Sequence, residues 1–292
     1  MKKEVKMIRY DLHVHSTASD GDLSPSQVME KAAGQGISVI ALTDHDTTSG
    51  CEEAAETAKK YGMRFIPGIE ITAKEYDKLH ILGLGVDPQC EELVGEMKKC
   101  ADSRRQRTYA ICEVLASMGV HTEPDRINSS VSGNVGKPHI AREIVKMGLA
   151  DSVKDAFDRF LTDPRIEAVK KYELGYADAV SLIHKAGGLA MLAHPYQIKL
   201  RDTDLDSFAA KLKQSGLDGI ECWYSAYTTE MTAMYLSLAE KYDLLVSLGS
   251  DFHGLSVKPD VMLADGINGS ILKQRQLNPF ECERCILNRL MP

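Results

Sequence analysis

The sequence predicts an α/β protein, in which a small helical subdomain is inserted into a parallel sheet or barrel. Two observations carry this prediction. Short apolar runs alternate with amphipathic segments in the first and last parts of the chain, whereas residues from about 100 to 170 carry helical patterns alone. Because a strand, a helix and a following parallel strand form a right-handed unit, repeated units of this kind build a parallel sheet or a barrel.

The individual elements follow from apolar periodicity and from capping residues. Residues 37–42 form a nearly continuous apolar run, which is typical of a parallel strand buried on both faces. Ser24 and Pro25 are suited to the cap and the first residue of a helix. The expected strands cover residues 8–14, 37–42, 63–66, 189–193, 218–222 and 244–248, and another strand leads on to His80-Ile81-Leu82-Gly83. The expected helices outside the middle segment cover 24–33, 50–61, 176–185, 204–215 and 229–242.

The middle of the chain is expected to be helical. A long amphipathic helix over residues 91–118 is followed by a polar segment and by shorter helices near 139–147 and 153–161, without a strand pattern. The predicted domains are therefore a barrel made of residues 1–99 and 171–292 and a helical insertion made of residues 100–170.

Composition and charge narrow the classes of function. The 292-residue chain is 43% hydrophobic and 26% charged, as in ordinary globular proteins, and its net charge of −7 argues against stable binding of duplex nucleic acid. It has no signal-peptide core, no apolar run that could span a bilayer, and seven scattered cysteines. We therefore expect a reduced, cytoplasmic protein without a membrane role. Cys282-x-x-Cys285 lacks the second pair that a zinc site needs.

The strongest functional signal is a set of histidine and acidic residues at strand ends. His13 and His15 are one residue apart, and alternation along a strand sends both imidazoles to the same side. The carboxyl edge of a parallel sheet or barrel is where active sites are built. The candidate ligands at these ends are His13, His15, Asp20, His45, Glu70, His80, His194, Asp251 and His253, which include six of the nine histidines.

Each acidic residue taken alone has a second interpretation, as a helix cap or a polar loop residue. The whole set, however, exceeds what one ion needs, since metal sites use about four to six ligands. We therefore expect two or three divalent ions, with Mn²⁺ as the expected metal and Zn²⁺ or Fe²⁺ as alternatives, because imidazole and carboxylate ligands suit them. Asp44 and Asp46 either orient imidazoles and hold loop amides or are turn residues.

In chain order, five segments resemble the motifs of the PHP (polymerase and histidinol phosphatase) family. They are Asp11-Leu12-His13-Val14-His15-Ser16, Thr43-Asp44-His45, Pro67-Gly68-Ile69-Glu70, Ala193-His194-Pro195 and Gly249-Ser250-Asp251-Phe252-His253. The resemblance implies a distorted seven-stranded β/α barrel with a trinuclear metal centre that hydrolyses phosphoesters. The ligands that it implies are His13, His15, Glu70 and Asp251 for one ion, Asp20, His45 and His253 for a second, and His80 and His194, with Glu70 bridging, for a third.

Within the family, the chain resembles the branch of nucleoside-3′,5′-bisphosphate phosphatases and the 5′-to-3′ exoribonuclease RNase AM. The segments that carry this resemblance are Ser19-Asp20-Gly21 followed by Leu23-x-Pro25, the helical insertion after His80, and two basic elements, Ser103-Arg104-Arg105-Gln106-Arg107 and Gly136-Lys137-Pro138-His139. The implied substrate is a small nucleotide with two phosphates or a short RNA with a 5′ phosphate.

The basic elements are interpreted as phosphate ligands. Arginines on a helix can fork onto a phosphate, and a turn that opens a helix offers its amides to an anion. The expected substrate-binding residues are Asp20, Ser103, Arg104, Arg105, Arg107, Lys137, Pro138 and His139. Arg104 and Arg105 would neutralise the phosphate that does not react, and His139 would protonate the leaving oxygen. A solvated helix face is the alternative for the arginines.

The expected reaction is hydrolysis of a phosphate monoester by a hydroxide held between metal ions. The catalytic residues would be His13, His15, Glu70, Asp251 and His139. Two alternatives remain open. One is a monophosphatase of the histidinol-phosphate type, which needs no second phosphate, and the other is a non-catalytic metal-containing module.

Two departures from the branch concern how a substrate is held. Lys137 stands where the branch commonly has arginine, and residues 162–171 replace a Gly-x-Pro-Ala-Tyr-Val-Pro type of segment. A lysine keeps the charge but loses the bidentate fork. Four aromatic residues that follow strand ends, Tyr196, Trp223, Tyr224 and Tyr227, are candidates for stacking on a base or for packing at the rim.

Overall fold

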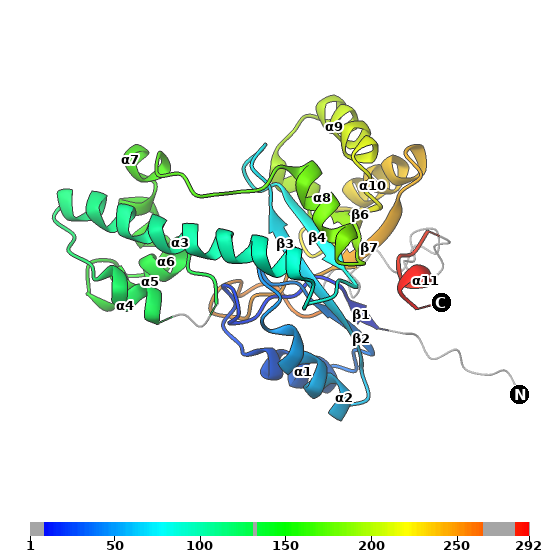
Figure 1. Cartoon of the computed structure of the whole chain (residues 1–292), viewed down its shortest axis with the longest axis horizontal. Coiled ribbons are helices and arrows are strands. Elements are labelled where there is room, and N and C mark those ends of the chain that lie inside the picture. The colour runs from blue at the N-terminus through cyan, green and yellow to red at the C-terminus, as the bar shows by residue number, and fades with distance from the viewer. Residues whose placement is uncertain (1–8, 131–132, 265–283, 292) are drawn as a thin grey trace, which may run out of the picture.

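The computed structural model, which describes residues 9–130, 133–264 and 284–291, contains one seven-stranded sheet curved into a barrel (Figure 1). Its strands, adjacent in sequence order, are β1 (Tyr10–Asp11), β2 (Val39–Leu42), β3 (Arg64–Thr72), β4 (His80–Leu84), β5 (Leu189–Leu192), β6 (Gly219–Tyr224) and β7 (Leu245–Gly249). The barrel is nearly closed, because the amide of Leu12 donates to the carbonyl of Leu248 at 3.1 Å and Val14 forms a parallel bridge with Phe252. The prediction of a seven-stranded α/β barrel is confirmed.

The expectation that all strands are parallel is wrong at β4, which runs antiparallel to both β3 and β5. The connection from β3 to β4, residues 73–79, is too short for the crossover that a parallel neighbour requires. The chain therefore turns back after β3. His80 opens β4 instead of closing a strand, and the reversed direction places it at the same edge of the barrel as the other ligands.

The strand expected over residues 63–66 continues through Pro67 to Thr72 as one strand, β3, which changes partner at Pro67. Residues before it pair with β2 in parallel, and residues from Gly68 onward pair with β4. A Cβ atom at Gly68 would lie 2.7 Å from the Thr43 side chain and 2.9 Å from the Leu42 carbonyl, so only glycine fits this crossing point. Glu70, two residues further on, is fully buried and faces the ligand edge.

Helices cover the outside of the barrel. They are α1 (Pro25–Gly34), α2 (Cys51–Lys60), α8 (Tyr176–Lys185), α9 (Asp202–Gln214) and α10 (Thr229–Lys241), with the short η2 (Pro195–Ile198) and α11 (Leu287–Leu290). The predicted cap of α1 is confirmed: Ser24 accepts from the amide of Gln27, and Pro25 is the first helical residue. Within the described residues, no helix is long and apolar enough to cross a membrane.

The middle of the chain projects from the barrel as a helical unit (Figure 1). It consists of α3 (Glu91–Ser117), α4 (Pro124–Ser129), α5 (Lys137–Lys146), α6 (Val153–Ala156), the π-helical turn η1 (Phe157–Leu161) and α7 (Pro164–Glu167). Leu93 and Met97 in the first half of α3 pack into the barrel core, whereas Ile111 and Leu115 belong to a second hydrophobic cluster within the insertion. The expected domain boundary at residue 100 therefore falls inside one continuous helix.

The part of the tail that the structure describes packs against the barrel. The amide of Val246 in β7 donates to the carbonyl of Arg284 at 2.9 Å, and Val246 forms a parallel bridge with Cys285. The Tyr10 hydroxyl lies 3.6 Å from the Cys285 sulfur. Cys282, the other half of the Cys-x-x-Cys pair, and Ile8, the expected start of β1, lie outside the described residues.

Candidate metal centre and substrate cavity

The nine ligands expected from the sequence meet at one edge of the barrel, with Glu70 at their centre. Oε2 of Glu70 lies 3.3, 3.0 and 3.2 Å from ring nitrogens of His13, His15 and His45. Its Oε1 lies 2.8 Å from His80 Nδ1 and 2.9 Å from His194 Nε2. One buried carboxylate thus faces five imidazoles, which is the placement that a bridging ligand requires.

The donor atoms form three groups, within each of which they lie no more than 4.8 Å apart. The groups are His13, His15, Glu70 and Asp251; His15, Asp20, His45 and His253; and His45, Glu70 and His80. The family resemblance implied these groups apart from three details: His15 joins the second group, His45 joins the third, and His194 is not in the third. His194 nevertheless contacts Glu70 directly.

The chemistry of these donors fits divalent ions. Within the described residues, the buried atoms Nδ1 of His15, Nδ1 of His45 and Oε2 of Glu70 make no contact with hydrogen-bond geometry, although buried polar atoms are nearly always satisfied. Burial alone would raise the pKa of Glu70, but the imidazoles of His45, His80 and His13 hold it well below its usual range. The group is therefore an anionic centre surrounded by lone pairs, which is suited to cations that accept imidazole and carboxylate ligands.

Two buried residues orient these ligands, and sequence reasoning missed the first of them. Glu221 in β6 is fully buried; its Oε1 lies 3.2 Å from Nδ1 of His13, and its Oε2 accepts from the amide of His194 at 2.8 Å. The sequence does contain a signal for Glu221, because it is an acidic residue within the otherwise apolar strand β6. Asp44 accepts from the Ser16 amide, the Ser16 hydroxyl and the Ser19 hydroxyl, so it holds the loop that carries Asp20.

Asp251 is oriented by two further side chains. Its Oδ1 faces the imidazoles of His13 and His15, at 3.6 and 3.3 Å, while its Oδ2 accepts from the Tyr224 hydroxyl at 2.6 Å and from the ammonium of Lys258. These donors leave one oxygen of Asp251 for a metal ion. No periodic pattern marks Lys258 in the sequence, because it lies in an irregular segment after β7.

Three residues at this edge have left-handed backbone conformations that L-residues rarely adopt. Their φ angles are 50° at Asp46, 22° at His194 and 56° at Asp251. Such conformations are unfavourable by about 1–3 kcal/mol each and gather where the surrounding structure imposes them for function. Two of the three residues are expected metal ligands, so ligand placement and backbone strain coincide.

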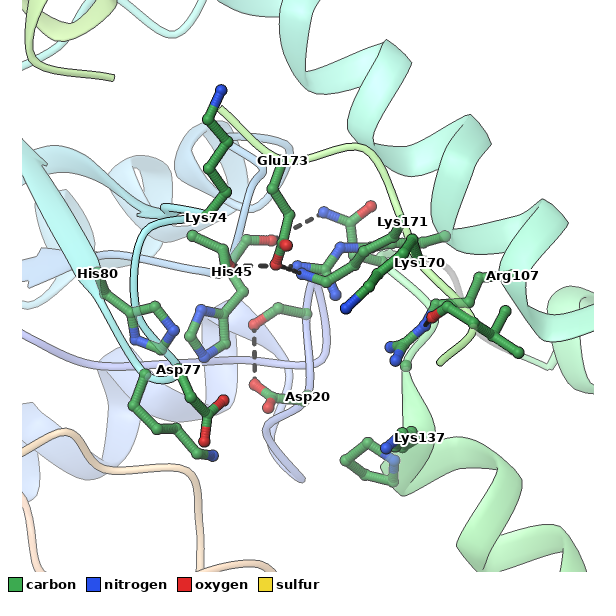
Figure 2. Close-up of a pocket in the computed structure, with 18 of the residues that line it drawn as sticks. Asp20, His45, Lys74, Asp77, His80, Arg107, Lys137, Lys170, Lys171 and Glu173 are labelled. Carbon is green, nitrogen blue, oxygen red and sulfur yellow. Dashed lines mark hydrogen bonds and ion pairs between the residues drawn. The ribbon is translucent and has the colours of Figure 1, made fainter. Parts of the chain in front are cut away.

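A cavity of about 640 Å³ opens beside the ligands, between the barrel and the insertion (Figure 2). Asp20, His45 and His80 line its barrel side. Of the substrate residues expected from the sequence, the structure brings Arg104, Arg107, Lys137, Pro138 and His139 into its wall. It does not bring two others there: Arg105 is exposed beside Asp102, at 3.8 Å, and the Ser103 hydroxyl accepts from the Tyr172 amide at 2.7 Å.

Two cationic residues of the wall, Arg104 and Lys137, pair with carboxylates. Arg104 forms an ion pair with Asp46, which also accepts from the Thr72 amide at 2.8 Å. Lys137 pairs with Glu167 at 2.6 Å. Burial, which favours the neutral imidazole, lowers the pKa of His139 to about 4.

His139 is the third residue of helix α5, and its side chain caps the start of the helix. Its Nδ1 accepts from the amide of Gly136 at 3.0 Å, so the ring proton of the neutral imidazole sits on Nε2. His139 can therefore act as a hydrogen-bond donor from Nε2 on the cavity wall.

The insertion is tied to the ligand loops at one more point. The Asn134 amide group donates to the carbonyls of His45 and Asp46 at 2.8 and 2.9 Å. Of the aromatic residues considered for stacking, Trp223, Tyr224 and Tyr227 are buried, so their rings do not face the cavity, and Tyr224 instead donates to Asp251.

The fold and the site together define a class: an α/β barrel with clusters of imidazole and carboxylate groups suited to metal ions at one edge, beside a cavity rich in basic residues. The chain belongs to the PHP family, because the PHP domain model matches residues 11–251. That range contains eight of the nine expected ligands, and His253 lies two residues beyond it.

Relatives of known name share most of the chain. A 5′-3′ exoribonuclease of Haemophilus influenzae is 35% identical over 84% of this chain and 90% of its own length. A 3′,5′-nucleoside bisphosphate phosphatase of Chromobacterium violaceum is 31% identical over 85% of this chain and 88% of its own length. A solved structure, described as an amidohydrolase of Chromobacterium violaceum with bound sulfate and no metal, superposes with a TM-score of 0.77 at 30% identity over 87% of this chain and 89% of that chain.

Proposed function

We propose that the chain is a metal-dependent phosphoesterase that removes phosphate from a nucleoside 3′,5′-bisphosphate or shortens a 5′-phosphorylated oligoribonucleotide from its 5′ end. The observation that carries this proposal is the cationic cavity that opens directly onto the metal ligands. The exoribonuclease and the bisphosphate phosphatase among its relatives support the substrate class, and the sulfate in the related structure supports binding of a tetrahedral oxyanion.

The ligand set is suited to two or three ions, for which we propose Mn²⁺, with Zn²⁺ or Fe²⁺ as alternatives. Bound ions of this kind activate water and neutralise phosphoryl oxygens. His13, His15, Glu70 and Asp251 hold the ions in place, and Glu221 fixes the ring of His13 through its Nδ1 atom. Fixed ligands matter here, because a partner behind a histidine ligand sets its orientation and its basicity.

The insertion, residues 100–170, supplies the substrate side of the site. Arg104 and Arg107 lie one helical turn apart on α3 and both line the cavity, so they share a face toward the phosphate that does not react. Lys137, which lines the cavity at the start of α5, offers positive charge to the reacting end. The neutral imidazole of His139 donates a hydrogen bond from Nε2 toward the leaving oxygen. Arg105, which points away from the cavity, has no part in this proposal.

Two rival functions share the barrel and the metal ligands. A monophosphatase of the histidinol-phosphate type would not depend on Arg104, and a non-catalytic module would release no phosphate at all. The test is phosphate release in the presence of Mn²⁺ from adenosine 3′,5′-bisphosphate, AMP, histidinol phosphate and a 5′-phosphorylated oligoribonucleotide. We expect preference for the bisphosphate or the oligoribonucleotide, abolished by His13→Ala. Preference for histidinol phosphate would overturn the substrate, and absence of any release would overturn the enzyme.

A matched pair of variants separates the substrate role of the insertion from its structural role. Arg104→Ala should lower activity on the bisphosphate far more than on an aryl phosphate ester, because only the bisphosphate has a second phosphate. Arg105→Ala, one residue away on the exposed face of the helix, should change neither. Equal losses on both substrates in Arg104→Ala would contradict the assignment.

A further inference from the structure

The cavity wall carries more positive charge than a bisphosphate needs. Four acidic side chains line it, whereas its basic residues are Lys74, Lys78, Arg104, Arg107, Lys137, Lys170 and Lys171. The chain as a whole has a net charge of −7. Positive charge is therefore concentrated at this one cavity, against the overall sign of the protein, which is the pattern that a polyanionic ligand requires.

Three of these cations have carboxylate partners and four do not. Arg104 pairs with Asp46, Lys137 with Glu167, and Lys171 with Glu173 at 2.7 Å. In the ranges that the structure describes, no carboxylate lies within 4 Å of the charged groups of the other four, which are Lys74, Lys78, Arg107 and Lys170. These charges are compensated by water or by a ligand.

The inner cations also repel one another. Burial lowers the pKa of Lys171, and the neighbouring charge of Arg104 lowers it further. The pKa of Arg107 is lowered by the same two causes. Holding Arg104, Arg107 and Lys171 close together costs free energy, because their positive charges repel one another. A bound anion would offset this repulsion.

Backbone contacts place Lys170 and Lys171 at the cavity. They lie in the segment that leads from α7 back to α8, and the guanidinium Nε of Arg107 donates to the carbonyl of Val169 at 2.8 Å. At the other end of the segment, the amide of Lys74 donates to the carbonyl of Leu174 at 2.9 Å. Figure 2 shows Arg107, Lys170 and Lys171 on the side of the cavity away from His45 and His80.

A nucleoside bisphosphate has only two phosphates, which are too few to contact all the basic residues of the cavity wall. In the proposed function, one phosphate of a nucleoside bisphosphate would lie at the metal ligands, and the second would be bound by Arg104 and Arg107. Lys74 and Lys170, both exposed at the rim of the cavity, then have no anion. Each further nucleotide of a chain adds one backbone phosphate.

We propose that Lys74 and Lys170 bind phosphodiesters that follow the second and later nucleotides, so that the preferred substrate is a short single-stranded oligonucleotide and not a mononucleotide. This inference rests on the proposed function. It assigns the rim lysines, which lie outside the recognisable family motifs, to recognition of substrate length.

The test compares Lys74→Ala, Lys170→Ala and the double variant with Lys60→Ala, an exposed lysine on the outer helix α2. The measurement is kcat and KM with Mn²⁺ for adenosine 3′,5′-bisphosphate and for 5′-phosphorylated oligoribonucleotides of two, three and five nucleotides. An exposed ion pair is worth about a two- to fivefold change in affinity, so the double variant should raise KM for the longest substrate roughly tenfold. The bisphosphate should change by less than about twofold, with kcat unaffected.

A binding measurement keeps this inference separate from the proposed function. A fluorescent 5′-phosphorylated pentaribonucleotide is titrated with the protein in EDTA at several salt concentrations. Each lost phosphate contact should make the slope of log K against log salt less negative by about 0.7. Unchanged slopes and KM values in the double variant, or equal changes for the bisphosphate, would overturn the rim site. If the wild type hydrolysed none of the substrates but the slope of log K against log salt still changed in the double variant, only the proposed function would be overturned.

Discussion

The ion pair between Arg104 and Asp46 connects the substrate cavity to the metal centre and allows a quantitative prediction. Asp46 directly follows the ligand His45, and its carboxylate also holds the Thr72 amide. Burial alone would raise the pKa of Asp46, yet the charge of Arg104, assisted by Lys171, lowers it to about 2. The two side chains are 14% and 2% exposed, so solvent screens the pair weakly.

The size of the interaction follows from this pKa. A fall from 3.8 to about 2 corresponds to about 2 kcal/mol of stability at neutral pH, since one pKa unit is worth about 1.4 kcal/mol. Removing Arg104 alone leaves a buried charge, so Arg104→Ala should lower the free energy of unfolding by about 3 kcal/mol. Asp46→Asn should also destabilise, but the double variant should lose about 2 kcal/mol less than the sum of the two.

The assay is a double-mutant cycle by urea unfolding in EDTA, so that metal binding does not contribute. Because the folded-state pKa of Asp46 is depressed, the coupling is fully present above the unfolded pKa near 4 and is lost as the pH falls toward 2. The coupling should therefore be the same at pH 8 and pH 5. Additive losses, or a coupling that disappears already between pH 8 and pH 5, would refute the reasoning.

Three further predictions concern single groups. Glu221→Gln should weaken Mn²⁺ binding by about 10- to 100-fold, because the partner of His13 is lost; calorimetric titration that gives the wild-type affinity would argue against it. Tyr224→Phe should weaken Mn²⁺ binding by roughly tenfold through Asp251, without unfolding the protein, whereas a fall in thermal stability alone would indicate mere packing. His139 should titrate near pH 4 in an NMR experiment on the metal-free protein, since burial lowers its pKa to about 4, and an ordinary value near 6.5 would show that the ring is solvated.

Much of the metal site could be predicted because its signal is local. A histidine pair at a spacing of two residues, and acids at the ends of apolar runs, require only strand geometry to bring them to one edge. His80 was placed at the correct edge for an incorrect reason. The seven residues before it already indicated a reversed strand, since a parallel neighbour needs a dozen or more.

The substrate side was harder, but part of the error was avoidable. Adjacent residues on a helix point about 100° apart, whereas residues three apart share a face. Arg104 and Arg107 therefore line the cavity together and Arg105 does not. Lys170 and Lys258 lie in irregular segments, where no periodicity relates sequence position to direction, and only tertiary packing brings them to the site.

The central claim is that the ligands around Glu70 form a polynuclear metal site on which phosphoester hydrolysis depends. The most direct test reloads chelated protein with increasing Mn²⁺ and measures bound metal and phosphate release from adenosine 3′,5′-bisphosphate in the same samples. We predict binding of two or three ions per chain and activity that rises only after the first ion is bound. Full activity in the chelated protein, or saturation of both quantities at one ion per chain, would contradict the account.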